Sequence, residues 1–373
     1  ENMKRSIAKQ MTAGVLMVSM VFGLTACGQK SQDSQENPGS ADSPRTEAAV
    51  TEAVPESEAG SEAETASNQG EALEVHVGDF LGETFLYPVK LAAELGMFEE
   101  EFAKDNIKIC VDYLGSGAVM NEALTAGDLQ MSFLGGQPTY SGIANGNGVK
   151  IITMATVSSA DPCLLVRADS DITEVSQLAG KNLAVNIGTD NHYQMMEMLA
   201  LGGVVEDDIQ LYNLKGNEAL SALLSGEIDC MQSIAPNKWR YVLDGDVKIL
   251  SNMHETAGRN NQVLVATEEF RKEHGDIIVR FLKVLQQALD YYDENKEECW
   301  EILAEYCDAD AELMEHYMED YDCTLGLTDA DKEYMARVYD FLYSHEMLIT
   351  EIDLADIYDE SFLTEAFGTV DCH

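Results

Sequence analysis

The chain has 373 residues, enough for two ordinary domains, and 45% of them are apolar, which is a globular fraction. Its 67 acidic residues far outnumber its 23 lysines and arginines, and the formal net charge is -44. A charge of this sign repels phosphates, so the composition argues against nucleic acid as a partner.

The first 27 residues predict an export signal. A basic start with Lys4 and Arg5 precedes an apolar run from Met11 to Gly23 that is too short to span a bilayer. The run is followed by Leu-Thr-Ala-Cys, which resembles the lipobox of a bacterial lipoprotein. That resemblance implies cleavage before Cys27 and a lipid on its sulfur. An ordinary secretory signal with an incidental cysteine is the alternative.

Residues 28–72 predict a disordered acidic tether. The segment contains no aromatic residue and carries ten acids against two bases. It has too little apolar surface to offset the entropy of ordering the chain. We therefore expect a folded body that begins near Leu73 and is held on a flexible tether at the outer face of a bacterial cell membrane.

Residues 73–166 alternate between short β-rich runs and stretches of helical periodicity. This alternation is typical of βαβ units and of a largely parallel sheet covered by helices, so we assign these residues to the N-terminal part of a first lobe. The expected strands are residues 73–77, 107–114, 131–134 and 149–156, and the expected helices are residues 87–105, 118–127 and 138–146.

The same rhythm restarts in residues 167–260, which we expect to form a second lobe. A further strand within 261–270 then returns the chain to the first lobe, and the acidic helices up to residue 373 pack mainly there. The sequence thus predicts an α/β fold with two lobes, parallel-rich sheets and a hinge of two segments. In the second lobe, strands are expected at 182–187, 209–214, 228–233 and 247–250, and helices at 194–203, 218–226 and 236–243.

Glycine-rich turns follow several of the predicted strands. Ligands of open parallel sheets bind beyond the carboxyl ends of the strands, and the N-terminus of the next helix offers unpaired N–H groups. In the turn from Gly188 to Tyr193, the glycine permits close approach, and Thr189 and Asp190 either present oxygens or cap the helix. His192 either faces the ligand or packs against its neighbours.

Four stretches, in this order, resemble the substrate-binding lipoproteins of ABC importers for sulfonates, nitrate and taurine. They are residues 87–101, 115–138, 176–214 and 222–239. The resemblance implies the type II periplasmic-binding-protein, or Venus flytrap, fold and a ligand site between the lobes. The site residues that it implies are Asp79, Phe80, Leu81, Ser116, Gly117, Gly136, Gln137, Pro138, Thr189, Asn191, His192 and Tyr193.

One stretch departs from the family pattern. Where the family often has two tryptophans near the ligand, residues 229–236 read Asp-Cys-Met-Gln-Ser-Ile-Ala-Pro. The hydroxyl of Ser233 then joins the expected contacts, and the specific solute stays open. Whether Lys238, Arg240 or Arg259 reaches an anionic ligand stays open as well.

We predict no cofactor and no metal site. The seven histidines are scattered, and the cysteines lack the Cys-x-x-Cys spacing of metal or redox sites. A disulfide among Cys299, Cys307 and Cys323 is left open. The chain also lacks the glycine motifs of dinucleotide and P-loop sites.

The expected function is capture of a small organic or oxyanionic solute and its delivery to a permease and its ATPase, by a monomer without enzymatic activity. Two alternatives remain. One is a sensing lipoprotein that presents its closed form to a receptor. The other is an enzyme of the same fold that acts on a pyrimidine or menaquinone precursor, with His192 as a base.

Overall fold

The computed structural model describes residues 72–82, 85–158, 161–256, 259–348 and 350–368, all within one compact unit. The predicted signal, Cys27 and the tether as far as residue 71 lie outside the described residues.

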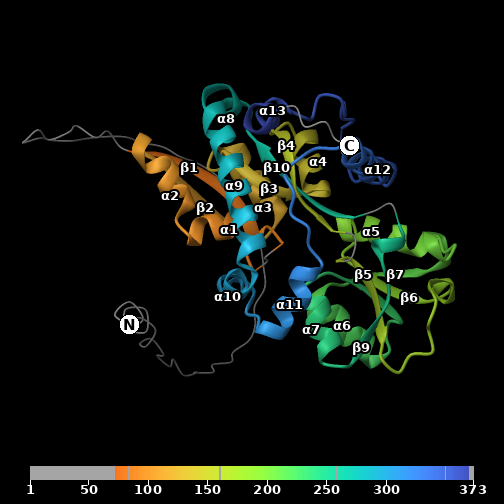
Figure 1. Cartoon of the computed structure of the whole chain (residues 1–373). Coiled ribbons are helices and arrows are strands. Elements are labelled where there is room, and N and C mark those ends of the chain that lie inside the picture. The colour runs from red at the N-terminus through yellow and green to blue at the C-terminus, as the bar shows by residue number, and fades with distance from the viewer. Residues whose placement is uncertain (1–71, 83–84, 159–160, 257–258, 349, 369–373) are drawn as a thin grey trace, which may run out of the picture. The chain divides into compact units, whose positions relative to one another are not determined.

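The first lobe is built on a five-stranded sheet with the order β2-β1-β3-β10-β4 (Figure 1). Its strands are β1 (Leu73–Phe80), β2 (Ile107–Leu114), β3 (Met131–Gly135), β4 (Lys150–Ser158) and β10 (Asn260–Ala266). β1 is parallel to β2 and β3, whereas β10 is antiparallel to both of its neighbours. The sheet is therefore mixed, with one inserted antiparallel strand.

The second lobe repeats this plan with the order β7-β6-β8-β5-β9. Its strands are β5 (Cys163–Arg167), β6 (Asn182–Val185), β7 (Gln210–Asn213), β8 (Cys230–Ser233) and β9 (Val247–Asn252). β6 is parallel to β7 and β8, and β5 is the antiparallel insertion between β8 and β9.

Two connections join the sheets, from β4 to β5 and from β9 to β10. The strand that follows each connection is the inserted antiparallel strand of the sheet it enters. The second sheet begins at Cys163, before the expected start of the second lobe at residue 167, because β5 pairs with β8 and β9. The predicted two-lobe α/β fold is confirmed.

Helices of the first lobe form two groups. α1 and α2 pack with α9, while α3 and α4 pack with each other and against β3. α1 has a proline in its first turn, and α3 is capped by Ser116 and ends at Gly127, whose φ is 82°. The bounds are α1 (Tyr87–Glu94), α2 (Met97–Phe102), α3 (Gly117–Ala126), α4 (Gly136–Ala144), α8 (Glu268–Glu273) and α9 (Gly275–Glu294).

The second lobe carries α5 (Asp190–Leu201), α6 (Gly216–Ser225) and α7 (Asn237–Leu243). Of the C-terminal helices, α12 contacts α4 and α5, and α11 contacts α7, so this segment packs on both lobes. Its helices are α10 (Lys296–Cys307), α11 (Ala311–Glu319), α12 (Asp329–Ser344) and α13 (Ser361–Phe367). Short 3-10 turns cover Ala103–Asp105, Val175–Leu178, Glu206–Asp208 and Met253–Glu255.

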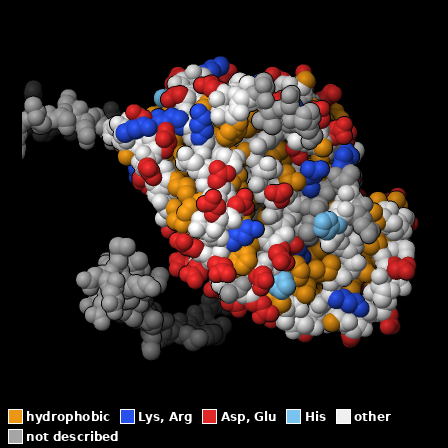
Figure 2. Space-filling view, in the orientation of Figure 1, with side chains coloured by type: hydrophobic (Ala, Val, Ile, Leu, Met, Phe, Trp, Pro, Cys, Tyr) orange, Lys and Arg blue, Asp and Glu red, His pale blue; other side chains and the backbone are white. Residues whose placement is uncertain are grey.

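Alternating strand residues fill separate cores on the two faces of the second sheet. Leu164 and Val166 belong to one core and Cys163 and Leu165 to the other. The core of the first lobe also includes Tyr193 of α5, so packing is continuous between the lobes. Acidic side chains are spread over the face of the protein shown in Figure 2, as expected for a solvated acidic surface.

Candidate functional site

The candidate site lies where the parallel strands of both sheets turn into helices. β3 continues directly into α4 at Gly136, and β6 leads through Gly188 into α5. Gly188 has a φ of 82°, a left-handed conformation that favours glycine. The turns that the sequence singles out therefore stand at the sheet edge where ligands of such folds bind.

The two lobes meet directly at the N-termini of α4 and α5. Oδ1 of Asp190, the first residue of α5, accepts a hydrogen bond of 2.8 Å from the backbone N–H of Gln137. A methyl group on Gly136 would lie only 3.0 Å from the same oxygen. Burial raises the pKa of the Asp190 carboxyl to about 6, although the N–H groups of Gln137 and Gly136 favour its charged form.

The turn after β2 packs against the beginning of α4. A Cβ on Gly117 would lie 2.5 Å from Cβ of Pro138, so only glycine fits at this position. Ser116 is exposed, and its Oγ accepts a 3.4 Å hydrogen bond from the N–H of Val119. The side chain of Gln137 donates to Oγ of Ser141. These contacts place the predicted Ser116, Gly117, Gln137 and Pro138 together.

The predicted residues at the end of β1 have different surroundings. Asp79 is fully buried and forms an ion pair with the equally buried Lys90. Burial raises the pKa of the Asp79 carboxyl, and the Lys90 ammonium offsets part of this rise. Phe80 packs its ring 5.5 Å from that of Phe85, whereas Leu81 is 67% exposed. Asp79 thus has its counter-charge inside the protein.

On the second lobe, Thr189 and Asn191 flank Asp190 and are half-buried. Oγ1 of Thr189 donates to the carbonyl of Asn186 and does not cap α5. His192 is 1% exposed and lies against α12, with its ring centre 5.1 Å from that of Phe341. Burial lowers the pKa of His192, although the nearby Glu206 carboxylate opposes this shift.

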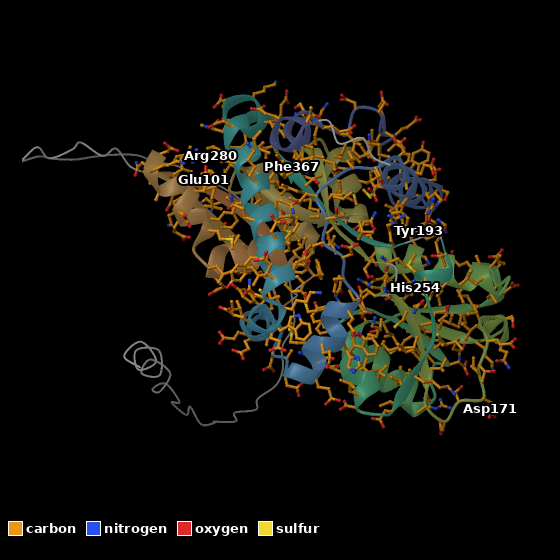
Figure 3. All side chains as sticks on the ribbon, in the orientation of Figure 1. Glu101, Asp171, Tyr193, His254, Arg280 and Phe367 are labelled. Carbon is orange, nitrogen blue, oxygen red and sulfur yellow. The ribbon has the colours of Figure 1, made fainter. Side chains whose placement is uncertain are left out.

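Tyr193 lies where α5 meets α12 (Figure 3). Its hydroxyl donates to Glu197 at 2.7 Å and accepts from Arg337 at 3.3 Å. Ser233, at the end of β8, is buried, and its Oγ donates to the carbonyl of Ile234 at 3.5 Å. His192 and Tyr193 therefore both face the C-terminal helix α12.

Each of the three candidate bases has a partner inside the protein. Lys238 is buried and paired with Asp320. Arg240 donates to the carbonyls of Cys307 and Asp308, and Arg259 pairs with Asp331 at 3.1 Å. We assign none of the three to the ligand site, because each already donates to an oxygen within the described part of the chain.

Several buried amide groups that the sequence analysis missed lack a hydrogen-bond partner among the described residues. They are Oε1 of Gln194, Nε2 of Gln232, both polar atoms of the Asn261 side chain and Oε1 of Gln262. Gln262 pairs with Gly135 across β10 and β3. The sequence pattern that could have revealed Asn261 and Gln262 is a pair of polar residues near the start of an otherwise apolar strand. Such amides become buried with the strand, and buried amides need hydrogen-bond partners.

The six cysteines described, which include Cys299, Cys307 and Cys323, are free thiols. Within the described ranges, no three His, Cys, Asp or Glu side chains are grouped so that they could hold a metal ion. No helix in these ranges combines the length and the apolarity needed to cross a bilayer.

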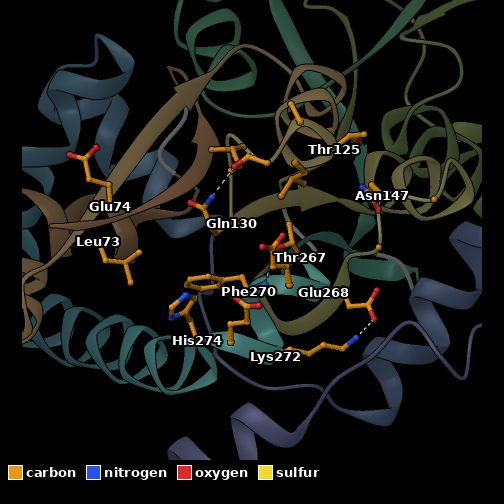
Figure 4. A pocket seen from close by; sticks show the side chains of 18 residues that line it. Leu73, Glu74, Thr125, Gln130, Asn147, Thr267, Glu268, Phe270, Lys272 and His274 are labelled. Atoms are coloured by element: carbon orange, nitrogen blue, oxygen red, sulfur yellow. Dashed lines mark hydrogen bonds and ion pairs between the residues drawn. The ribbon is translucent and has the colours of Figure 1, made fainter. Parts of the chain in front are cut away.

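One pocket of about 880 Å³ lies near the amino-terminal ends of β1 and β3, which is the end of the first sheet away from the candidate site (Figure 4). It is lined by Leu73 at the start of β1, by Gln130 just before β3, and by Thr267 and Phe270 after β10. Gln130 is held there by its bond to the N–H of His76 at 2.8 Å. This pocket is separate from the turns of the candidate site.

Comparison with known proteins gives relatives that are named as binding proteins. A "Putative aliphatic sulfonates-binding protein" of Bacillus subtilis (strain 168) is 27% identical over 282 residues, which are 75% of this chain and 85% of that protein. The "Taurine-binding periplasmic protein" of Escherichia coli (strain K12) is 24% identical over 208 residues, 54% of this chain and 63% of that protein.

Solved structures share the fold. The periplasmic aliphatic sulphonate binding protein SsuA of Escherichia coli superposes with a TM-score of 0.71 at 19% identity, over 78% of this chain and 93% of that chain. The desulfurization enzyme DSZB superposes with a TM-score of 0.61 at 13% identity, over 79% and 98%. The same architecture therefore occurs in a binding protein and in an enzyme.

The family described as NMT1/THI5 like matches residues 87–299, which is more than half of the chain. The match runs from α1 to the first residues of α10 and includes the turns that open α3, α4 and α5. The resemblance inferred from the sequence is confirmed, and the chain belongs to the NMT1/THI5-like family.

Proposed function

We propose that the chain is the solute-binding lipoprotein of an ABC importer, which captures a small organic or oxyanionic solute between its lobes and delivers it to a membrane permease. The names of its relatives support this role, because they refer to binding of aliphatic sulfonates and taurine. Family membership and the shared fold point in the same direction.

The observation that carries the proposal is the direct meeting of the N-termini of α4 and α5 across the two lobes, at Gln137 and Asp190. A solute held by these two turns touches both lobes at once. It therefore binds more tightly when the lobes are together and shifts the equilibrium between open and closed forms by that difference in affinity. No covalent step is required.

The solute contacts belong to the turns after the parallel strands. We assign them to the predicted residues nearest this meeting point and to the end of β8. Asp79 and His192, which are buried against Lys90 and α12, support the site through packing. The assigned contacts are Ser116, Gly117, Gly136, Gln137, Pro138, Thr189, Asn191 and Ser233.

Lipid attachment at Cys27 would hold the protein at the outer face of the cell membrane, next to its permease. Mass spectrometry of the membrane fraction tests this part, since a diacylglyceryl group adds a defined mass to the N-terminal cysteine.

The genes that lie beside this one distinguish import from sensing. A neighbouring pair of permease and ATPase genes favours import, whereas a neighbouring membrane receptor gene favours sensing.

A ligand screen by thermal unfolding tests the binding role. The panel contains alkyl and aryl sulfonates, nitrate, bicarbonate, pyrimidines and carboxylates. A solute that binds only the native state adds about 2.7 kcal/mol of stability at a hundredfold excess over its dissociation constant. A shift with one class supports solute capture. Conversion of a compound into a product during incubation would contradict it and favour the enzymatic alternative.

A further inference from the structure

His345 and Glu206 form an ion pair between the two lobes. His345 directly follows α12, whose Val338 and Leu342 belong to the core of the first lobe. Glu206 begins the 3-10 turn between α5 and β7 in the second lobe. Nε2 of His345 lies 3.1 Å from Oε2 of Glu206, and the two side chains are 33% and 40% exposed. This contact therefore joins the lobes at a place that water and protons reach.

The hydrogen bonds of the His345 ring require a proton on both nitrogens. Nδ1 lies 2.7 Å from the carbonyl oxygen of Phe341, which can only accept, so Nδ1 donates. The hydroxyl of Ser344 gives its own proton to the same carbonyl at 2.9 Å and leaves none for Nδ1. Nε2 faces the carboxylate of Glu206, which also accepts. A neutral imidazole has a single N–H, so only the imidazolium makes both bonds.

His192 of α5 faces the same carboxylate from within the second lobe. Its Nε2 is 3.6 Å from Oε1 of Glu206, and its ring centre is 6.0 Å from that of His345. Burial lowers the pKa of His192, whose side chain is only 1% exposed. His192 is therefore the neutral ring of the two, and the exposed His345 is the one that exchanges its proton with solvent.

Other charged groups also lie along the contact between α5 and α12. The hydroxyl of Tyr193 is bonded to Glu197 and Arg337, and burial raises its pKa, so it stays protonated near neutral pH. The exposed Asp207 and Glu346 are next to the ion pair in the sequence and add negative charge around the imidazolium. Asp190, at the start of α5, has a pKa of about 6 and also titrates in this range.

We propose that His345 and Glu206 are a pH-dependent clasp between the lobes, which holds while the imidazole is protonated and is released when the imidazole loses its proton. Carboxyl and imidazole side chains ordinarily titrate at about 4.3 and about 6.5, so such a clasp holds in mildly acidic medium and weakens above neutral pH. The closed form gains population as the pH falls. The affinity for a solute held between the lobes then rises as well, a consequence that rests on the proposed function.

The backbone N–H of Gln137 reports whether the lobes are in contact. As the second residue of α4, it has no acceptor within its own helix, and it donates to Asp190 of the other lobe. Hydrogen exchange of this amide in the purified, ligand-free, full-length protein therefore measures opening without a solute. Mass spectrometry with fragmentation of the peptide resolves it.

His345→Gln and Glu206→Gln each remove one charge of the clasp. At pH 5.5, we expect the Gln137 amide to exchange about two- to fivefold faster in either variant than in the wild type, as for a partly exposed ion pair. The double variant should exchange no faster than the single ones. At pH 8, all four proteins should exchange alike. Each comparison is made at one pH, where the intrinsic exchange rate and the titration of Asp190 are common to all four.

His76→Gln is the matched control. His76 pairs with Asp112 at 2.7 Å, and the two residues lie on the neighbouring strands β1 and β2 of the first sheet. This variant also removes a partly exposed histidine from a carboxylate, but within one lobe. It should leave the exchange of the Gln137 amide at the wild-type rate at both pH values. The melting temperature of each variant shows that it is folded.

Three outcomes overturn the inference. If neither variant speeds exchange at pH 5.5, the ion pair does not hold the lobes together. If both speed it equally at pH 5.5 and pH 8, the pair acts through packing and not through its charge. If the wild-type amide exchanges at the unprotected rate at pH 5.5, the lobes do not stay in contact. Solute capture stands in each case, because the ligand screen measures it independently.

Discussion

At the scale of single residues, Asp190 gives the protein a specific dependence on pH. Its carboxyl has a pKa of about 6 in the folded protein, raised from 3.8. A raised pKa means that the folded state holds the proton more tightly than the unfolded state. The stability that this adds is complete below about pH 4 and is lost as the pH rises through about 6.

Asp190→Asn removes this dependence. We expect the free energy of unfolding of the variant to exceed that of the wild type by about 1–3 kcal/mol at pH 7.5 and to match it at pH 4. The neighbouring Tyr140 and Tyr334 stay protonated throughout this range because their pKa values are raised well above 10. Urea unfolding of both proteins at the two pH values measures the difference. A difference that is independent of pH would contradict this account.

His192 was singled out by the sequence as a residue of the ligand turn, with packing as the alternative. Its side chain lies buried against Phe341, and its Nε2 is 3.6 Å from the Glu206 carboxylate. We expect His192→Ala to lower the ligand-free stability by about 2–4 kcal/mol, because it leaves a cavity between α5 and α12.

The exposed His254 provides the control for His192. His254→Ala should leave the urea midpoint within a few tenths of a molar of the wild type. If His192→Ala instead keeps the wild-type stability and only weakens ligand binding, the ring acts in the site and its packing against Phe341 contributes little.

At the scale of secondary structure elements, the close contact between α3 and α4 requires a residue without a Cβ atom at position 117. Gly117→Ala brings Cβ against Pro138, whereas a Cβ on Gly115 meets no atom within 4 Å. We expect Gly117→Ala to cost about 1–3 kcal/mol of stability and Gly115→Ala to change it by much less. Urea unfolding compares the two variants, and equal losses of stability would show that the contact with Pro138 is not the cause of the loss in Gly117→Ala.

Strand and helix periodicity was sufficient to predict most elements of both lobes. Apolar runs such as those of β2 and β4 are long enough to identify, and the glycines after α3 and α6 lie where these helices end. The insertion of β5 and β10 as antiparallel strands could not be predicted, because the pairing partner of a short apolar run depends on residues far away in the sequence.

The sequence located the turns of the candidate site, but it could not predict the surroundings of every side chain in them. The turns at Ser116, Gln137 and Thr189 follow strands and carry a local pattern of glycine and small polar residues. The placement of His192 depends on α12, which lies about 140 residues further along the chain and was not expected beside α5. Local sequence thus located the turns, and distant packing decided which side chains face inward.

At the scale of the whole molecule, the C-terminal helices connect both lobes, which predicts one cooperative unfolding transition. The two tryptophans allow a test. Trp239 is on α7 and stacks 4.7 Å from His316 of α11, whereas Trp300 is on α10 and donates to Tyr292 of α9. Within each single-tryptophan variant, Trp300→Phe and Trp239→Phe, tryptophan fluorescence and far-UV circular dichroism should give the same urea midpoint. Two probes that give different midpoints in one variant would mean that the lobes unfold independently.

The strands on either side of the two connections between the lobes pair with each other. Ser158 and Asn260 are paired neighbours on β4 and β10, although a whole lobe separates them in the sequence. Cys163 and Asn252 are paired in the same way on β5 and β9. The second lobe is therefore a module whose entry and exit lie side by side. In topological terms, β4 and β10 are an antiparallel strand pair, and the second lobe is inserted in the connection between them.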